Sequence, residues 1–175
     1  MPSTMEAVDV LAARVGFDKP RVRAVARSLT DAGRLPPGAP ARSPMLDISN
    51  VVDLLIGCAV DVPLRAVADT VAKIRELTPA GTPISALPAS LQYSAGNYLD
   101  SLADLAADGS KDVRRVKLEF VGNWNEVAIH QPDGTINRFV EPGALASNWQ
   151  HTGHRRSTAV NGAAFADAIN DLFGA

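Results

Sequence analysis

The sequence predicts an α+β fold, with an N-terminal helix-turn-helix and helical region followed by a small antiparallel β-meander and a C-terminal helix. Apolar residues recur three and four positions apart over the first two thirds of the chain, and their period changes to two near residue 116. The chain has 175 residues and is 46% hydrophobic, which suits one large domain or two small ones. We predict three regions: 1–43, 44–109 and 110–175.

The first helix is predicted to begin at Ser3. Ser3 and Glu6 form a capping box, in which each side chain bonds the other residue's backbone amide. Gly16 and Phe17 interrupt the helical pattern and predict a short turn. The expected apolar face comprises Met5, Val8, Leu11, Ala12 and Val15.

A second helix is predicted over residues 19 to 32. Asp18 is a good N-cap, Pro20 is tolerated in the first turn, and Gly33 can adopt the left-handed conformation that ends a helix. Its expected buried stripe comprises Val22, Val25, Ala26 and Leu29.

Charge is unevenly distributed along the chain. The net charge is -2, but residues 19–42 hold six basic residues against the single acid Asp31. Residues 1–45 carry +3, so the remaining 130 residues carry -5. A cationic patch on an otherwise acidic protein is typical of a surface that meets phosphates.

The basic residues of the second helix lie away from its apolar stripe. Lys19, Arg23 and Arg27 are four apart and fall within roughly 80° of one another at about 100° per residue, and Arg21 and Ser28 flank them. Arginine can donate two hydrogen bonds to guanine or one to a phosphate. We therefore predict that this face contacts double-stranded DNA.

The run from Leu11 to Leu35 resembles the helix-turn-helix of winged-helix bacterial DNA-binding regulators. It contains Leu-Ala-x-x-x-Gly from Leu11 to Gly16 and Leu-x-x-x-Gly-x-Leu from Leu29 to Leu35. The resemblance implies that Gly16 is the turn residue, that residues 18–27 face the groove of DNA, and that Leu29 and Leu35 are packing anchors.

A proline-rich segment, residues 36–44, stands where those regulators have two wing strands. It is either a semi-rigid arm, with Arg34 and Arg42 touching phosphates or a minor groove, or a linker. The layout of a small helix-turn-helix, an arm and an apolar helical pair also resembles regulators encoded by prophages and gene transfer agents.

The middle region is predicted to be helical. Asp47 or Ser49 can cap a helix that runs to about Val60, a second helix begins near Asp61 and Pro63 and ends at Thr78-Pro79, and a third spans residues 88 to 107. The first of these is apolar nearly all round. It is therefore expected either in the core or, through residues 49–77, in a homodimer interface.

The last region changes to strand periodicity. Strands are predicted over residues 116–120, 127–129 and 135–140, and a helix over 161–173 is expected to lie on the sheet. We interpret residues 110–175 as a separate module that could contact a partner in the transcription machinery.

No motif predicts catalysis, a cofactor or a metal site. His151 and His154 have no cysteine or carboxylate cluster nearby that would complete a metal site. The loop of His154, Arg155 and Arg156 could be a second phosphate contact or an ordinary basic loop. Cys58 lies in an apolar run, which favours a buried thiol over a nucleophile. No signal peptide or membrane span is visible, so a cytoplasmic protein that is not an enzyme is expected.

Three functions remain open from the sequence. The first is a sequence-specific transcriptional regulator, phage-derived, that binds double-stranded DNA through Lys19, Arg21, Arg23, Arg27, Ser28, Arg34 and Arg42. The second is a small terminase-type DNA-packaging subunit, which would assemble as a ring. The third is a protein-interaction adaptor that reuses the helical unit without binding DNA.

Overall fold

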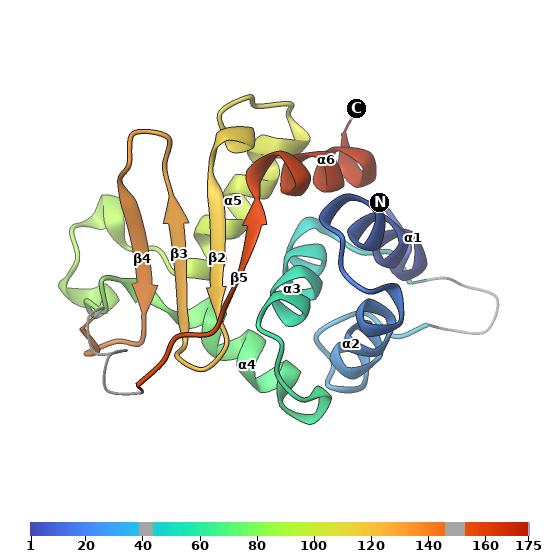
Figure 1. Cartoon of the computed structure of the whole chain (residues 1–175), viewed down its shortest axis with the longest axis horizontal. Helices are drawn as coiled ribbons and strands as arrows, with labels where there is room; N and C mark the ends of the chain where they lie inside the picture. Colours follow the sequence, from blue (N-terminus) through green and yellow to red (C-terminus); the bar gives the residue numbers. More distant parts are fainter. Residues whose placement is uncertain (39–43, 146–152, 175) are drawn as a thin grey trace.

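The computed structural model describes residues 1–38, 44–145 and 153–174. Within these ranges it contains six α-helices and one five-stranded antiparallel sheet, which confirms the predicted α+β class. Figure 1 shows the sheet on one side and the N-terminal helices on the other, with α6 alongside α1.

The first helix begins where the capping box predicted. In α1 (Thr4–Val10), the Ser3 amide donates to Glu6 Oε2 at 2.7 Å and the Glu6 amide donates to Ser3 Oγ at 3.3 Å. The helix continues as a π-helical turn, η1 (Leu11–Val15), and Gly16 ends it with φ +85°. Met5 departs from the predicted apolar face because Ala7, Val8 and Leu11 point into the core and leave Met5 47% exposed.

The second helix, α2 (Lys19–Asp31), also agrees with its predicted bounds. Asp18 accepts from the Arg21 amide at 3.1 Å, and Gly33 adopts φ +74° just beyond the end. Its apolar stripe is fully buried, comprising Val22, Val25, Ala26 and Leu29.

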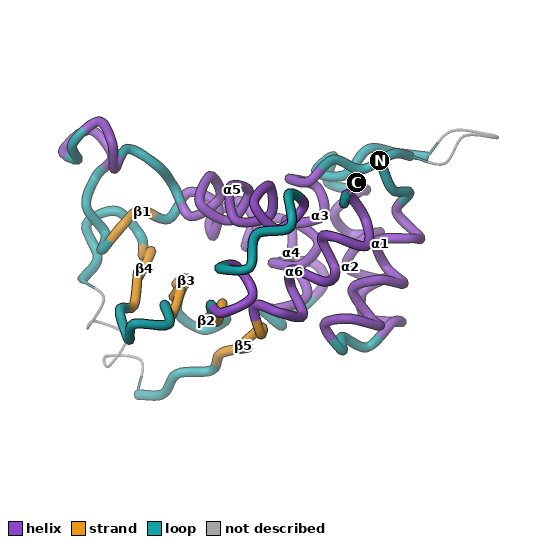
Figure 2. Tube along the Cα trace, turned by 90° about the horizontal axis from the view of Figure 1, so that it is seen from above, coloured by secondary structure: helices purple, strands orange, loops and turns teal. Residues whose placement is uncertain are grey.

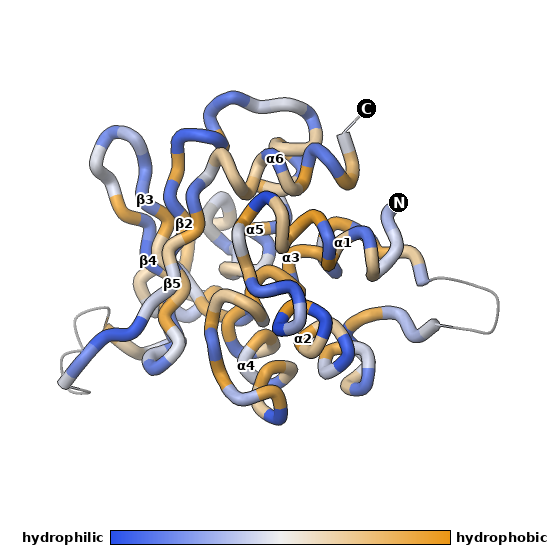
Figure 3. Tube along the Cα trace, turned by 45° about the vertical axis from the view of Figure 1, so that its right-hand side comes forward, coloured by the Kyte–Doolittle hydropathy of each residue, from blue (hydrophilic) through white to orange (hydrophobic). Residues whose placement is uncertain are grey.

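Helix α3 (Ile48–Ala59) is the centre of the helical part. Asp47, one of the two predicted caps, accepts from the Asn50 amide at 2.8 Å. Residues 51–60 are all buried, and α3 packs against α2, α4 (Leu64–Glu76), α5 (Ala95–Ala107) and β5 (Ser157–Asn161). Its hydrophobic character is visible in Figure 3. Burial within the chain therefore accounts for the apolar circumference of α3, and the homodimer through residues 49–77 stays a prediction.

The third predicted helix of this region is shorter than expected. Residues 84–86 and 89–91 form two 3-10 turns, η2 and η3, each preceded by a proline. The helix α5 starts only at Ala95, where Ser94 and Asn97 form a capping box. The capping box explains the later start, because the Ser94 side chain and backbone already bond Asn97 and so begin a new helix there, while residues 92–94 stay non-helical.

The sheet has the order β1-β4-β3-β2-β5, and all neighbours are antiparallel. Strands β2 (Lys117–Val121), β3 (Glu126–His130) and β4 (Ile136–Val140) confirm the predicted meander and follow the 3-10 turn η4 (Val113–Arg115). The prediction missed the two edge strands β1 (Thr78–Pro79) and β5. Neither has an alternating apolar pattern, and the tertiary structure brings both to the meander.

One face of the sheet belongs to the helical core. Its inward side chains are Leu118, Phe120, Val127, Ile129, Phe139 and Val160. Figure 2 shows α5 on this side of the strands, whereas the described residues place no helix against the opposite face.

The C-terminal helix α6 (Gly162–Phe173) joins the two ends of the chain. It contacts α1, η1, α5 and β5, and Arg14 Nε lies 2.6 Å from Asp171 Oδ2. Buried residues from all three predicted regions form one hydrophobic cluster. Residues 110–175 are therefore not a separate module, because the apolar side of α6 is completed by the N-terminal helices.

The segment after α2 does not form a hairpin in its described part. Met45 pairs with Ser3 in an isolated antiparallel bridge, and the Leu46 amide donates to Pro2 O at 2.8 Å. Residues 39–43, including Arg42, lie outside the described residues.

In the described ranges, none of the helices combines the length and apolar character needed to cross a membrane.

The close approach of α2, α3 and α4 generates a first prediction, at Gly57. A Cβ at this position would lie 2.8 Å from Val25 Cγ1 and 3.0 Å from Val67 Cγ1, and valine side chains have little rotamer freedom to yield. We expect Gly57→Ala to lower the free energy of unfolding by about 1–2 kcal/mol in urea, despite the helix propensity of alanine. Gly38→Ala is the control, since its nearest neighbour is Pro44 Cδ at 3.7 Å. An equal or more stable Gly57→Ala variant would contradict the predicted clash.

Candidate nucleic-acid interface

The solvent face of α2 carries two arginines that are free of ion pairs within the described ranges. Arg23 and Arg27 are exposed and one helical turn apart, on the side turned away from the buried stripe. A hollow of about 420 Å³ lies between these side chains and Lys19, Pro20 and Ala24. The structure therefore brings together three of the predicted DNA-contacting residues: Lys19, Arg23 and Arg27.

Lys19 differs from the two arginines because it has a partner within the protein. Its Nζ lies 2.8 Å from Asp9 Oδ1, and both side chains are about half exposed. An ion pair this exposed adds little stability, because water screens it and two flexible side chains must be ordered. A phosphate could therefore replace Asp9 at small cost.

Arg21 and Ser28 are used to hold α2 in place. Arg21 Nη2 donates a hydrogen bond to Val62 O, and Ser28 Oγ donates one to Leu64 O at 2.9 Å. Val62 lies in the loop just before α4, and Leu64 is the first residue of α4. These two predicted contact residues therefore fix the helix on its α4 side rather than face a ligand.

Arg34 also contacts the protein interior. Its Nη2 lies 3.0 Å from Asp53 Oδ2, and its side chain is only 25% exposed. Asp53 is shared with Arg75, whose Nη1 lies 2.9 Å from Asp53 Oδ1 and which also pairs with Asp100. Burial raises the pKa of Asp53, although the neighbouring Arg75 and Arg34 counteract it. This pairing was not predictable from local sequence patterns, because Arg34 and Arg75 lie 19 and 22 residues from Asp53 along the chain.

The described ends of the proline-rich segment lie beside the arginines of α2. Pro36, Gly38 and Pro44 line a second hollow, of about 260 Å³, together with Arg23, Arg27 and residues of α1. Arg23 and Arg27 thus border both hollows. Arg42 lies outside the described residues, and the described flanks of its segment border the same surface as Arg23 and Arg27.

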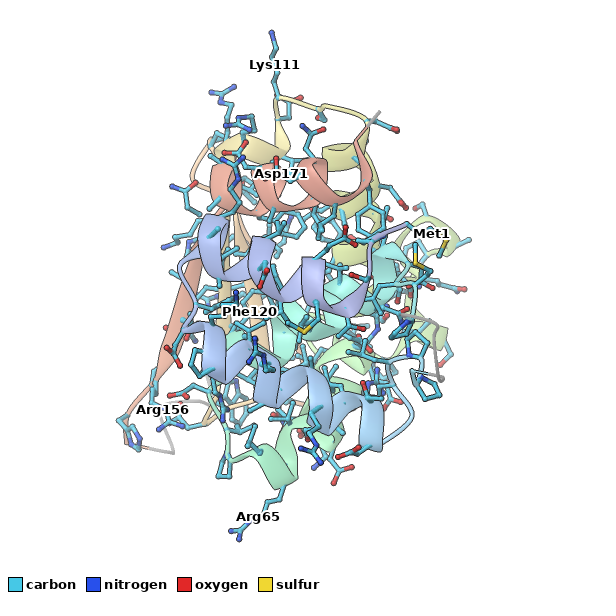
Figure 4. All side chains as sticks on the ribbon, turned by 90° about the vertical axis from the view of Figure 1, so that its right-hand side faces the viewer. Met1, Arg65, Lys111, Phe120, Arg156 and Asp171 are labelled. Carbon is cyan, nitrogen blue, oxygen red and sulfur yellow. The ribbon has the colours of Figure 1, made fainter. Side chains whose placement is uncertain are left out.

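The two N-terminal helices run side by side in opposite directions, as seen in Figure 4. Thr4, Met5 and Val8 of α1 share the second hollow with Ala26 and Thr30 of α2, which agrees with this arrangement. DNA-binding helix-turn-helix units usually cross at about 90–120°. The caps, the turn and the apolar stripe of α2 follow the predicted pattern, whereas the helix pair is an antiparallel hairpin.

A second group of polar side chains, not predicted from the sequence, lies on the outer face of the sheet. Glu126 is fully buried there and pairs with Arg138 and with Arg155, whose Nη1 lies 2.8 Å from Glu126 Oε2. Arg155 also lies 3.3 Å from Glu119 Oε1. This pairing argues against Arg155 as a phosphate contact. His151 lies outside the described residues.

Glu119 is the most perturbed carboxylate of this outer-face group. Ser157 Oγ donates to Glu119 Oε1 at 2.7 Å, and His130 Nε2 lies 2.8 Å from Glu119 Oε2. Burial opposes the charged form, but these hydrogen bonds and Arg155 outweigh it and lower the pKa of Glu119 to about 2. So weak a base is poorly suited to activate Ser157. The arrangement is therefore best explained as structural.

The described residues support neither a metal site nor a reactive thiol. No group of three or more histidine, cysteine, aspartate or glutamate side chains could hold a metal ion there. Cys58 is buried in α3, and burial raises the pKa of its thiol to about 12. The thiol is therefore unreactive at neutral pH.

Comparison of the chain with family models, curated proteins and solved structures gives no match.

The different roles of the arginines give a second prediction. Arg34→Ala removes a hydrogen-bonded partner of buried Asp53, so we expect the free energy of unfolding to fall by about 1–3 kcal/mol. Arg23→Ala and Arg27→Ala remove exposed side chains without ion pairs and should each change it by less than about 0.5 kcal/mol. Urea unfolding followed by circular dichroism measures all three. Equal losses for the three variants would contradict this division.

The third prediction concerns Glu119 and acid. The pKa of Glu119 is lower in the folded protein than in the unfolded chain, where it is about 4.3, so its stabilising effect is present above that pH and is lost as the pH falls toward about 2. Glu119→Gln should lower stability at pH 7 and make the decline between about pH 5 and 2 shallower. Urea midpoints measured at several pH values test this, and parallel declines for both proteins would contradict it.

Proposed function

We propose that this protein binds double-stranded DNA through the solvent face of α2 and acts as a sequence-specific transcriptional regulator in the cytoplasm. The observation that carries the proposal is the pair Arg23 and Arg27, exposed and one turn apart on a helix whose opposite side is fixed in the core. An anchored helix with free arginines is the arrangement that groove recognition requires.

The free guanidinium groups matter because binding need not break an existing ion pair. Arg23 and Arg27 are without one in the described ranges, so their charges and donors are available to phosphates or guanine edges. Lys19 adds a third cation that can exchange Asp9 for a phosphate. The rest of the chain is acidic, which disfavours contact of other surfaces with DNA.

The remaining predicted residues take supporting roles in this proposal. Arg21 and Ser28 fix α2 against the start of α4, and Arg34 anchors the chain after α2 to Asp53. They determine where the contact face lies without touching the ligand. Arg42 stays a predicted phosphate contact from the proline-rich segment.

The resemblance to winged-helix and prophage regulators supports the regulatory role, although the antiparallel pairing of α1 and α2 implies its own docking geometry. A regulator also needs a surface for the transcription machinery. We assign this contact to residues 110–175, as the sequence predicted; the outer-face polar group of the sheet, with Glu126 buried, has a structural role instead.

The fourth prediction tests DNA binding directly. Duplexes enriched by the full chain from random-sequence DNA are titrated in fluorescence anisotropy at several salt concentrations. Replacing both Arg23 and Arg27 by alanine should weaken binding by at least about 1 kcal/mol per lost specific contact, and should reduce the salt slope by about 1 per lost phosphate contact.

The matched control is Lys111→Ala with Arg115→Ala. It removes the same charge from an exposed region, and Figure 4 shows Lys111 beyond α6, far from α2. Equal binding by the Arg23/Arg27 variant and the unaltered protein would overturn the proposal, as would failure to enrich any duplex. Binding with a ring-shaped assembly in solution would instead favour the terminase-type subunit, and the absence of DNA binding would favour the adaptor.

A further inference from the structure

We infer that the α2 face reads a guanine and a neighbouring thymine in its DNA site, with Arg23 or Arg27 contacting the guanine and Ala24 contacting the thymine methyl. This inference rests on the proposed function and specifies which base pairs the face distinguishes.

The first hollow combines two kinds of surface. Its long side chains are Lys19, Arg23 and Arg27, and its short ones are Pro20 and Ala24. Because Pro20 and Ala24 are one turn apart and have short side chains, they form an apolar floor beside the row of cationic groups. The hollow measures about 420 Å³ and opens on the solvent side of α2.

This combination matches the major-groove edges of two bases. Guanine presents the O6 and N7 acceptors, which an arginine can engage with two parallel donors, whereas thymine presents a methyl group that favours an apolar contact such as alanine. Phosphates alone would need only the cations. The apolar floor therefore adds a preference that an electrostatic contact with the DNA backbone does not explain.

The charges limit where the duplex can lie along the helix. Asp31 is exposed near the C-terminal end of α2, where a carboxylate would repel phosphates. Arg21 and Ser28 are bonded to Val62 O and Leu64 O, so the α4 side of the helix is already occupied. The available face runs from Lys19 to Arg27 and has Ala24 within it.

The test uses the full chain and a duplex that it has enriched, altered one base at a time. Uracil in place of thymine removes only the methyl group, and 7-deazaguanine in place of guanine removes only the N7 acceptor. We expect one uracil position to weaken binding about fourfold, the value of one buried methyl. A guanine position close to it should lose about tenfold or more with 7-deazaguanine.

Variants assign each effect to a side chain. The guanine effect should disappear in Arg23→Ala or Arg27→Ala, and the uracil effect should disappear in Ala24→Gly. Because glycine also loosens the helix, Ala24→Ser serves as a second variant that replaces the methyl surface with a polar one. Both Ala24 variants should bind the uracil and thymine duplexes equally.

Uracil substitution without effect at every position would overturn this inference, as would a uracil effect that persists in both Ala24 variants. In either case, continued loss of binding in the Arg23/Arg27 variant would leave the proposed function standing. If the protein does not bind DNA at all, the enrichment step already shows it, because the full chain would then enrich no duplex.

Discussion

The arrangement of this protein depends on the burial of α3 on all sides. Residues 51–60 are inaccessible, and the helix is surrounded by α2, α4, α5 and β5. Removing so much apolar surface from water supplies a large part of the driving force for folding. It also fixes α2 with its apolar stripe inward, and Gly57 allows α2 and α4 to come close at the last turn of α3. The exposed side of α2 is therefore a consequence of how α3 is covered.

The polar interior of the helical part divides the basic residues into two groups. Arg34 and Arg75 neutralise Asp53, which would otherwise be an unpaired buried carboxylate. Arg21 satisfies a carbonyl in the loop just before α4. Arg23 and Arg27 have no such role in the described residues, so the cationic character of the sequence is concentrated by the fold into a much smaller surface. The candidate interface is defined by the cations that the protein does not use internally.

The sheet presents a similar contrast between its faces. The inner face is apolar and belongs to the common core, whereas the outer face buries Glu126 between Arg138 and Arg155 and holds Glu119 among Ser157, His130 and Arg155. Arg155 lies before β5, so these ion pairs connect the segment leading into the edge strand to the centre of the sheet. A buried glutamate with two arginines constrains which segments can meet there. We interpret the outer-face polar group as a set of structural contacts that hold the strands and the segment before β5 together.

The sequence by itself determined the features that depend on local interactions. The capping box at Ser3, the N-cap at Asp18, the left-handed glycines at positions 16 and 33 and the period-2 meander all involve residues close along the chain, so their physical cause is visible in the sequence. The same reasoning placed Arg23 and Arg27 on the solvent side of α2. The helix over residues 88–107 was predicted too long because the capping box of Ser94 and Asn97, which begins α5, was not recognised within the apolar pattern.

Tertiary structure alone decided which residues are available and which segments meet. Arg34 and Asp53 are 19 residues apart, Arg14 and Asp171 are 157 apart, and Arg155 reaches Glu126 across 29 residues. Such pairs depend on how the elements pack, and the periodicity of apolar residues in the sequence does not predict them. For the same reason the edge strands β1 and β5 and the antiparallel course of α1 and α2 were not predictable. The sequence predicted that the second helix is basic on one side, and the packing around α3 decided which of its cations can reach a ligand.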